Sequence, residues 1–372
     1  MERAEEGRRR LCFCINLPYA KKKKIHDRLH PMIPVIGVLD RYSQVADRAI
    51  RSRTTQGRVI DPIEYLVNNG QAHMKLVTAE QILRGIPVGV HAVIASRPNR
   101  RDDLEALAKL REDRIPLILD IDDDLYSYPR WSKLRFSRED VDFIVDCASF
   151  VSVTNATLYA RFHASEKPSR IVQSGFYVEK YCTGSIPIGE GFRVTMCNGD
   201  NLKSDDFSEE FCDLIYHFVE ENSDVYFDYF GDDAFPAPKH PRIKNYVGLS
   251  FDEHKRKLLN SSYSLTVMML GNKCHDRDAF FEAKSPVKYW EHGGFGIPGI
   301  FSNNAIYKAC INDGKNGFLA ENNVGAWRDR LYFAYNNRSR LRDIGQNAKA
   351  DVTERYHIRE AAGGFLSIVR EL

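Results

Sequence analysis

The chain has 372 residues, with 53 Lys or Arg against 51 Asp or Glu, so its formal net charge is +2. This near-balance excludes a strong electrostatic footprint for duplex DNA, and we expect no nucleic-acid partner. The hydrophobic fraction of 43% is typical of a globular chain and excludes a disordered or collagen-like protein. The length favours two domains with a ligand cleft between them.

No stretch of the sequence holds the ~18 consecutive apolar residues that a membrane-spanning helix needs. The eight cysteines are scattered without a CxxC pair, which favours a reducing compartment and therefore a cytoplasmic protein. Basic groups at 8–10 and 21–24 could hold the protein peripherally at the inner face of an anionic membrane. Such runs are more often simply solvated.

Short apolar runs alternate with longer amphipathic runs along most of the chain, a pattern typical of α/β domains with parallel sheets. The strands predicted in the first half are 11–16, 88–96, 116–120, 150–154 and 171–174. Helices are predicted between them at 102–111 and 157–164. A Gly- and Pro-containing stretch at 182–191 is the best linker candidate.

The alternation restarts after this linker. The strands predicted in the second half are 192–197, 225–231, 263–269 and 297–301, and the helices are 208–221, 251–260 and 285–292. The last stretch, 350–372, predicts one or two helices with a break near Gly363 and Gly364. The sequence therefore predicts two doubly wound, Rossmann-like domains.

Four carboxylates follow the predicted strand at 116–120, namely Asp120, Asp122, Asp123 and Asp124. Ligands of open α/β sheets bind beyond the carboxyl ends of the strands, so this position favours function. Crowding of negative charge raises some of the pKa values or recruits a cation. The alternative is a solvated acidic turn that caps the following helix.

A second candidate is the loop Asn198-Gly-Asp-Asn-Leu-Lys203, which follows the first strand of the second half. Gly199 would let the backbone approach a phosphate group, and Lys203 could neutralise that phosphate near a helix start. Taken alone, the loop is explained better as an ordinary turn with a surface lysine.

A third candidate is the helix predicted to start at Ser285, which would act as its cap with Pro286 at the first position. Four side chains then share a face near that start: Lys284, Ser285, Lys288 and Glu291. A helix start with two lysines favours a diphosphate, and Glu291 could accept hydrogen bonds from two adjacent sugar hydroxyls. The alternative is a surface helix with an internal Lys288–Glu291 pair.

The second half resembles the donor-binding half of the GT-B glycosyltransferases, especially the retaining family 4 group. Three segments carry this resemblance: Lys284-Ser-Pro-Val-Lys-Tyr-Trp-Glu291, Gly293-Gly-Phe-Gly-Ile-Pro298 and Asn316-Gly-Phe-Leu319. Upstream, 152–157 and 171–176 resemble the last elements of the family's first domain. The family's paired glutamates lie eight apart, and here the first position holds Ala283, with Glu282 beside it.

The resemblance implies a GT-B architecture in which two Rossmann-like domains face a central cleft. Residues 1–182 would form the acceptor-side domain, and residues 183–350 would form the domain that binds a nucleotide-sugar donor. Residues 351–372 would form a C-terminal helix that packs back on the first domain.

The resemblance also implies roles for single residues. Lys203 and Lys288 would hold the diphosphate, Ser285 would donate to it, and Glu291 would bind the ribose. Gly199, Glu282 and Lys284 complete the expected donor site. Asp120 and Asp122 would act on the acceptor hydroxyl, as base or as orienting groups.

The implied enzyme is a hexosyltransferase-type, retaining glycosyltransferase that moves a sugar from a nucleoside diphosphate sugar to an acceptor hydroxyl. Its acceptor would be a glycan or glycolipid, in polysaccharide, lipopolysaccharide or glycolipid biosynthesis. Cations and the helix start would stabilise the departing diphosphate, so no cofactor and no metal ion is required.

A different class of enzyme competes with this interpretation. The run Leu117-Ile-Leu-Asp-Ile-Asp-Asp-Asp-Leu125 also resembles the nucleophile motif of haloacid dehalogenase-like phosphatases. In that hypothesis Asp120 attacks phosphorus, Asp122 serves as acid and base, and Mg²⁺ bridges Asp120 with Asp232 and Asp233. A third hypothesis is a nonenzymatic sugar- or nucleotide-binding protein of the same architecture.

Overall fold

The computed structural model describes residues 33–45, 48–85, 89–128, 136–163, 165–183, 189–197, 207–270 and 278–372. Within these residues the chain builds two six-stranded parallel sheets and one antiparallel pair of strands, β2 (Tyr42–Val45) and β3 (Arg48–Arg51). The predicted strand at 11–16, the loop at 198–203 and the basic groups at 8–10 and 21–24 lie outside the described residues.

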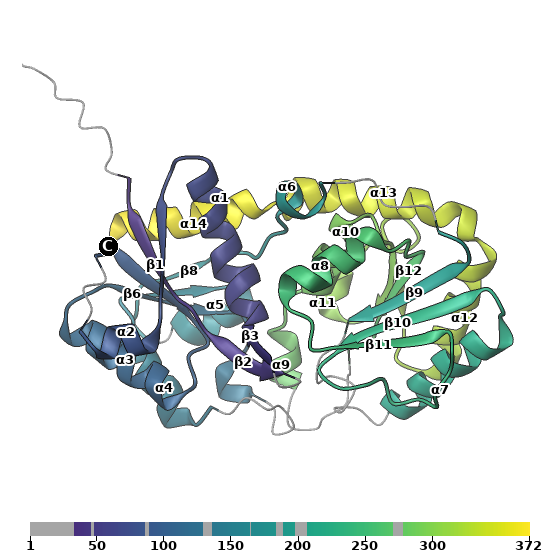
Figure 1. Cartoon of the computed structure of the whole chain (residues 1–372), viewed down its shortest axis with the longest axis horizontal. Helices are drawn as coiled ribbons and strands as arrows, with labels where there is room; N and C mark the ends of the chain where they lie inside the picture. Colours follow the sequence, from purple (N-terminus) through teal and green to yellow (C-terminus); the bar gives the residue numbers. More distant parts are fainter. Residues whose placement is uncertain are drawn as a thin grey trace, which may run out of the picture. The chain divides into compact units, whose positions relative to one another are not determined.

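The first sheet has the strand order β4-β1-β5-β6-β7-β8 (Figure 1). Its strands are β1 (Val35–Leu39), β4 (His73–Val77), β5 (Ala92–Ser96), β6 (Leu117–Ile121), β7 (Phe150–Val153) and β8 (Ser169–Ile171). The strands β5, β6 and β7 are buried along their whole length. Their sequences are therefore continuous apolar runs rather than alternating ones.

Helices cover both faces of the first sheet. On one face lie α2 (Ala79–Leu83), α3 (Arg101–Glu112), α4 (Arg138–Cys147) and α5 (Ala156–His163). On the other face lie the π-helix η1 (Thr55–Ile60), α1 (Asp61–Asn68) and α14 (Ile358–Glu371). The last helix of the chain thus shares a core with the first strand, through side chains such as Phe365, Ile36 and Val38.

The second sheet has the strand order β11-β10-β9-β12-β13-β14. Its strands are β9 (Phe192–Cys197), β10 (Val225–Gly231), β11 (Ile243–Val247), β12 (Leu265–Met268), β13 (Gly299–Ser302) and β14 (Phe318–Ala320). Numbered by appearance in the chain, this order is 3-2-1-4-5-6, that of the Rossmann fold. The strand order therefore reverses between β9 and β12, where ligands of such sheets bind.

The two faces of the second sheet are covered by different helices. The helices α7 (Phe207–Glu221) and α12 (Val324–Asn336) pack on one face around the buried Trp327. On the other face lie α8 (Phe251–Asn260), α10 (Val287–Gly294) and α13 (Arg338–Arg355). Remaining short elements are the 3-10 turn η2 (Leu125–Ser127), α6 (Val178–Tyr181), α9 (Asp278–Glu282) and α11 (Ala305–Lys308).

The predicted α/β architecture is confirmed, and three elements match their predicted bounds: Phe192–Cys197, Val225–Gly231 and Phe251–Asn260. In the predicted linker at 182–191, the described residues form no helix or strand. Sequence analysis missed β1, β4, β11 and β14 and the helical segment η1–α1. The edge strands β4 and β11 expose several side chains and so lack a continuous apolar run.

The predicted break near Gly363 and Gly364 is wrong, because α14 runs through both residues. The helices α13 and α14 separate instead at Tyr356 and His357. There the Phe176 amide donates to the Tyr356 carbonyl at 2.7 Å, and the Ile358 amide donates to the Phe176 carbonyl at 3.1 Å. These backbone hydrogen bonds, and the cap that His357 forms on α14, set the boundary.

Among the described residues, none of the helices combines the length and the apolar character that crossing a bilayer requires.

Substitutions at two glycines test whether close packing of α13 against Gly296 fixes the position of the end of α10. A Cβ atom added to Gly345 of α13 would lie 2.0 Å from the Gly296 carbonyl oxygen, whereas one added to Gly363 of α14 would meet nothing within 4 Å. We expect Gly345→Ala to lower the free energy of unfolding by about 1–3 kcal/mol through overpacking. Gly363→Ala should raise it by up to about 1 kcal/mol, because alanine favours the helix.

Urea unfolding of the two variants beside the parent measures both effects. Equal stabilisation by both substitutions would show that the contact between α13 and Gly296 is not tight.

Candidate functional site

The point where the second sheet reverses its strand order is marked by a cation. Cys197 ends β9, and Lys288 of α10 places its Nζ atom 3.5 Å from the Cys197 Sγ atom. The Lys288 side chain keeps 24% of its surface exposed. A positive charge thus stands at the carboxyl end of β9, where a Rossmann-like sheet binds its ligand.

The start of α10 carries no side-chain cap. The helix begins at Val287, one residue after Pro286, whose ψ of 44° is not helical. The prediction that Ser285 caps this helix with Pro286 at its first position is therefore wrong. The Tyr289 amide donates to the Pro286 carbonyl at 3.0 Å. Because no side-chain cap is formed among the described residues, the Val287 and Lys288 amides of the first turn are left to bind an anion.

Glu291, one turn into α10, is held between two lysines. Its Oε1 atom lies 2.7 Å from the Nζ atom of Lys255 of α8, and its Oε2 atom lies 2.6 Å from the Nζ atom of Lys288. Glu291 is 7% exposed and Lys255 is 1% exposed. The Lys255 ammonium also lies 4.7 Å from the centre of the Phe251 ring.

The charges of this triad depend on one another. Burial acts to raise the pKa of Glu291, but Lys255 and Lys288 outweigh it and hold that pKa well below its ordinary value. Burial lowers the pKa of Lys255, with Glu291 acting in the opposite direction. For Lys288 burial is outweighed by Cys197 and Glu291, so its pKa is raised. Glu291 is therefore an ionised acceptor at neutral pH.

Two histidines next to the triad are neutral. Burial lowers the pKa of His292 to about 3 and that of His254 well below its ordinary value. The Nε2 atoms of both rings are buried without a hydrogen-bond partner among the described residues. Neither histidine therefore adds a positive charge to the triad at neutral pH.

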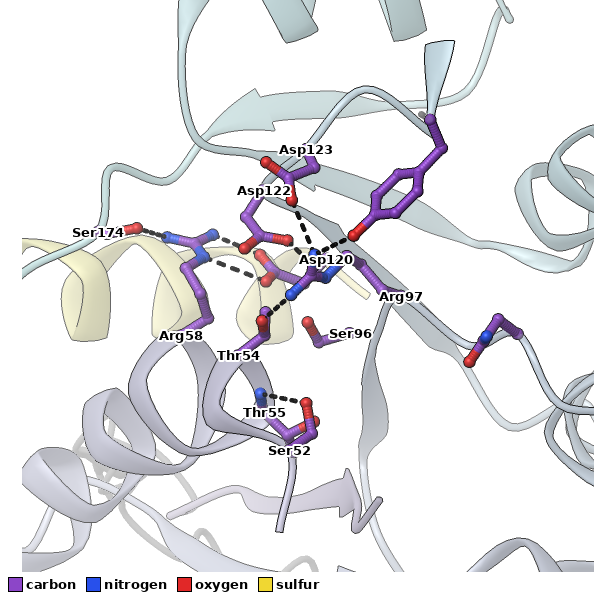
Figure 2. A network of polar contacts seen from close by, with 12 residues as sticks. Ser52, Thr54, Thr55, Arg58, Ser96, Arg97, Asp120, Asp122, Asp123 and Ser174 are labelled. Atoms are coloured by element: carbon purple, nitrogen blue, oxygen red, sulfur yellow. Dashed lines mark hydrogen bonds and ion pairs between the residues drawn. The ribbon is translucent and has the colours of Figure 1, made fainter. Parts of the chain in front are cut away.

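The acidic turn after β6 is neutralised by four cations, of which Figure 2 shows Arg58 and Arg97. Asp120, fully buried, pairs with Arg58 of η1, and the Ser152 hydroxyl donates to it at 2.8 Å. Arg58 in turn donates to the Ser174 hydroxyl at 3.0 Å. Asp124 pairs with Arg161 and is also fully buried.

Asp122 and Asp123 share one arginine. The Nε atom of Arg97 lies 3.0 Å from Asp122 Oδ1, and its Nη1 atom lies 2.7 Å from Asp123 Oδ2. Lys284 adds a second cation, 3.0 Å from Asp123 Oδ1. Arg97 adopts a φ of +44°, a left-handed conformation that non-glycine residues rarely hold and that is common at functional sites.

The environments of Asp122 and Asp123 push their pKa values apart. Burial raises the pKa of Asp122 to about 6, with Asp123 and Asp120 adding to the rise and Arg97 opposing it. Burial acts in the same direction on Asp123, but Lys284 and Arg97 outweigh it and lower its pKa. Such a separation is typical of a pair that divides acid and base roles.

The segment between α9 and α10 contacts the first sheet. The Asn155 side chain donates to the Ala283 carbonyl at 2.7 Å, and Ala283 is fully buried within the core of that sheet. Together with the Lys284–Asp123 ion pair, this contact ties the residues before α10 to the acidic turn. Lys284 is thus joined to Asp123 rather than to the Glu291 triad.

The predicted site residues therefore divide into groups. Lys288 and Glu291 lie together, Asp120 and Asp122 lie together, and Ser285 is half-buried just before α10. Glu282 ends α9 and is exposed. Gly199 and Lys203 lie outside the described residues. No group of three or more potential metal ligands gathers among the residues that the structure describes.

Sequence analysis missed four of the cations that complete the two clusters: Lys255, Arg58, Arg97 and Arg161. Lys255 stands in a Lys-Arg-Lys run that indicates a solvated helix face, and Arg58 lies in an unpredicted helix. Only Arg97 had a usable signal, since it directly follows a predicted strand.

Solved structures with the same architecture were found at low sequence identity. HepE from Anabaena, in complex with UDP and glucose, matches at 12% identity with a TM-score of 0.61, over 91% of this chain and 100% of HepE. Sucrose-phosphate synthase from Thermosynechococcus elongatus matches at 12% identity with a TM-score of 0.63, over 91% of this chain and 98% of the synthase. The fold is that of the GT-B glycosyltransferases.

The same fold also occurs in a Listeria monocytogenes protein assigned as a UDP-N-acetylglucosamine 2-epimerase. It matches at 12% identity with a TM-score of 0.57, over 91% of this chain and 96% of that protein. No protein-family model matches the sequence, and no curated protein matches it significantly. Because the GT-B fold is found in proteins assigned different reactions, the reaction must be argued from the site.

The triad makes a prediction about stability. Glu291→Gln leaves Lys255 buried without a counter-charge, so we expect it to lower the free energy of unfolding by about 3–5 kcal/mol. The double variant Lys255→Met/Glu291→Gln also removes the buried ammonium of α8, so no unpaired charge remains there. We therefore expect most of the lost stability to return. Chemical unfolding of parent, single and double variants measures the difference.

An unchanged unfolding midpoint in Glu291→Gln would contradict the buried ion pair. Glu105→Gln, at an exposed surface pair with Arg101, is the control and should cost less than about 1 kcal/mol.

Proposed function

We propose that this protein transfers a sugar from a nucleoside diphosphate sugar to an acceptor hydroxyl. The observation that carries the proposal is the ionised Glu291 between Lys255 and Lys288, one turn from the uncapped start of α10 and beside the end of β9. A hydrogen-bond acceptor suited to a ribose diol and cations suited to a diphosphate thus stand together at the end of β9. HepE, a protein with the same fold, holds UDP and glucose.

Glu291 is suited to the ribose because its carboxylate has about four lone-pair positions, and the two lysines use only part of them. The remaining positions accept hydrogen bonds from the two adjacent hydroxyls. Lys288 has three N–H donors, of which one faces Glu291 and one faces the Cys197 Sγ atom, so the third is left to bind a phosphate oxygen in this proposal. The amide N–H groups at the start of α10 complete this anion site.

The remaining donor contacts rest on the family resemblance. In this proposal Ser285 donates to the diphosphate, and Gly199 and Lys203 approach it from the loop after β9. Glu282 contacts the donor sugar. Lys284 positions Asp123 through their 3.0 Å ion pair while remaining next to α10.

Departure of the nucleoside diphosphate concentrates negative charge on the phosphate that leaves. In this proposal Lys288 and the helix start face that phosphate, and they stabilise the charge without having to reorganise. This electrostatic contribution comes entirely from groups of the chain.

On the acceptor side, we assign Asp122 as the base that accepts the proton of the acceptor hydroxyl. Its pKa of about 6 leaves it ionised, and thus able to accept a proton, at neutral pH while still basic enough to be effective. Its side chain keeps 20% of its surface exposed, whereas Asp120 is fully buried and engaged by Arg58 and Ser152. In this arrangement Asp120 orients the turn and Asp122 acts on the hydroxyl.

The phosphatase alternative is not favoured. A nucleophilic Asp120 would need one carboxylate oxygen free to attack phosphorus. Both of its oxygens accept hydrogen bonds from Arg58, and no surface of the residue reaches solvent. That hypothesis also leaves the Glu291 triad without a role.

The resemblance to the GT-B glycosyltransferases extends the proposal to the class of acceptor. The acceptor would be a glycan or glycolipid in polysaccharide, lipopolysaccharide or glycolipid assembly, with a hexosyl group transferred with retention of configuration in the cytoplasm. Peripheral attachment at the inner membrane face would bring a lipid-linked acceptor within reach.

Asp122 gives the proposal a pH dependence. Protonation of a base with a pKa of about 6 removes its activity, so the rate should be constant above pH 7 and fall about tenfold per pH unit well below 6. We expect Asp122→Asn to lower turnover by about 10²–10⁴-fold without weakening donor binding. Release of nucleoside diphosphate from a panel of nucleotide sugars, with and without glycan acceptors, provides the measurement.

Asp113→Asn, at an exposed surface pair with Lys109, is the matched control and should keep the parent profile. Acceptor-dependent turnover that Asp122→Asn leaves intact would remove Asp122 from the mechanism. A panel in which no nucleotide sugar is turned over or bound would contradict the proposed function itself.

A further inference from the structure

A second polar cavity lies at the amino-terminal edge of the second sheet, opposite the triad. It has a volume of about 530 Å³, in the range of small-molecule sites. Its walls come from Gly189 and Glu190 before β9, from side chains of β9, β10 and β11, from the end of α8 and from Ser261 and Ser262 before β12. The six residues of β9 separate this edge from Cys197 by about 16 Å, so one ligand does not span both sites.

Three cations line this cavity, Arg193, Lys244 and Lys257, together with the exposed carboxylate of Glu190. Among the described residues, no ion pair joins any of these three cations to an acid. Arg193 lies 4.8 Å from the centre of the Tyr226 ring, and Lys257 lies 4.7 Å from the centre of the Tyr246 ring. Stacking on tyrosine faces orients the two charges without neutralising them. Even with the carboxylates of Glu190 and Asp228 counted, the lining keeps a net positive charge, so the cavity favours an anion.

A buried carboxylate faces the same cavity. Asp228 is 3% exposed, and the Tyr263 hydroxyl donates to its Oδ2 atom at 2.7 Å. Its Oδ1 atom is buried without a hydrogen-bond partner among the described residues, although Lys244 is its register neighbour on β11. An unpartnered buried carboxylate oxygen is costly, so this atom indicates a missing hydrogen-bond donor.

We propose that this cavity binds a phosphorylated sugar. Its phosphate contacts Arg193, Lys244 and Lys257, and one of its hydroxyls donates to Asp228 Oδ1. A simple phosphate ion would satisfy the cations but has no sugar hydroxyl to donate to the carboxylate. A neutral sugar would satisfy the carboxylate and leave the three cations unpaired.

The cavity is connected to the donor site by one helix. Lys257 and Asn260 of α8 line the cavity, while Lys255 of the same helix pairs with Glu291. The inference is independent of the proposed function, because it rests on residues that take no part in donor binding or in the acidic turn.

Isothermal titration of the full chain with glucose 6-phosphate, inorganic phosphate and glucose tests the proposal. Glucose 6-phosphate should bind saturably and at least about tenfold more tightly than either of the other probes. Saturating UDP should leave this binding unchanged, because UDP would occupy the donor site. Displacement of glucose 6-phosphate by UDP would assign it to the donor site and overturn the proposal.

Two variants separate the contribution of the cations from that of the Asp228 carboxylate. Lys244→Glu/Lys257→Glu should weaken glucose 6-phosphate by at least about tenfold, while Lys308→Glu, an exposed lysine of α11 outside the cavity, should not. Asp228→Asn keeps an acceptor for the Tyr263 hydroxyl and should reduce the preference for glucose 6-phosphate over phosphate. Equal affinity for all three probes, or affinity unaffected by the paired charge reversal, would overturn the assignment.

Discussion

The Lys255–Glu291–Lys288 triad is the constraint on which the functional arrangement depends. A buried carboxylate is costly unless cations surround it, and here α8 and α10 each supply one. This pairing fixes α10 against α8 and keeps Glu291 ionised. It also places Lys288 at the end of β9, where the strand order reverses. Stability and ligand recognition therefore use the same three side chains.

The acidic turn after β6 of the first sheet also holds buried carboxylates next to cations. Here, however, the carboxylates take different roles. Asp120 and Asp124 are enclosed by their arginines and serve to hold the turn. Asp122 shares Arg97 with Asp123 and keeps an exposed edge, so its charge is compensated less completely. A row of similar carboxylates is thus differentiated by how far each is buried and by which cation reaches it.

Much of the second sheet could be predicted from sequence, because β9, β10 and α8 show clear apolar periodicity and clear ends. Glu291 and Lys288 were identified from local spacing, because residues that are three apart on a helix share a face. Lys255, Arg58 and Arg97 could not be found in this way. They approach the carboxylates from other elements, and only tertiary packing decides that a lysine in a charged run becomes buried. The same holds for the α13–α14 break, which the Phe176 backbone sets from 180 residues away.

The central claim is that the triad binds a nucleoside diphosphate. Calorimetric titration of UDP, GDP, dTDP, ADP and CMP into the parent and into Lys288→Met tests it most directly, with Lys308→Met as the control. The account predicts saturable binding of at least one nucleoside diphosphate, weakened about tenfold or more in Lys288→Met because a charge-assisted contact is lost, and unchanged in the control. Binding that is equally tight in Lys288→Met, or no binding of any nucleotide by the folded parent, would contradict it.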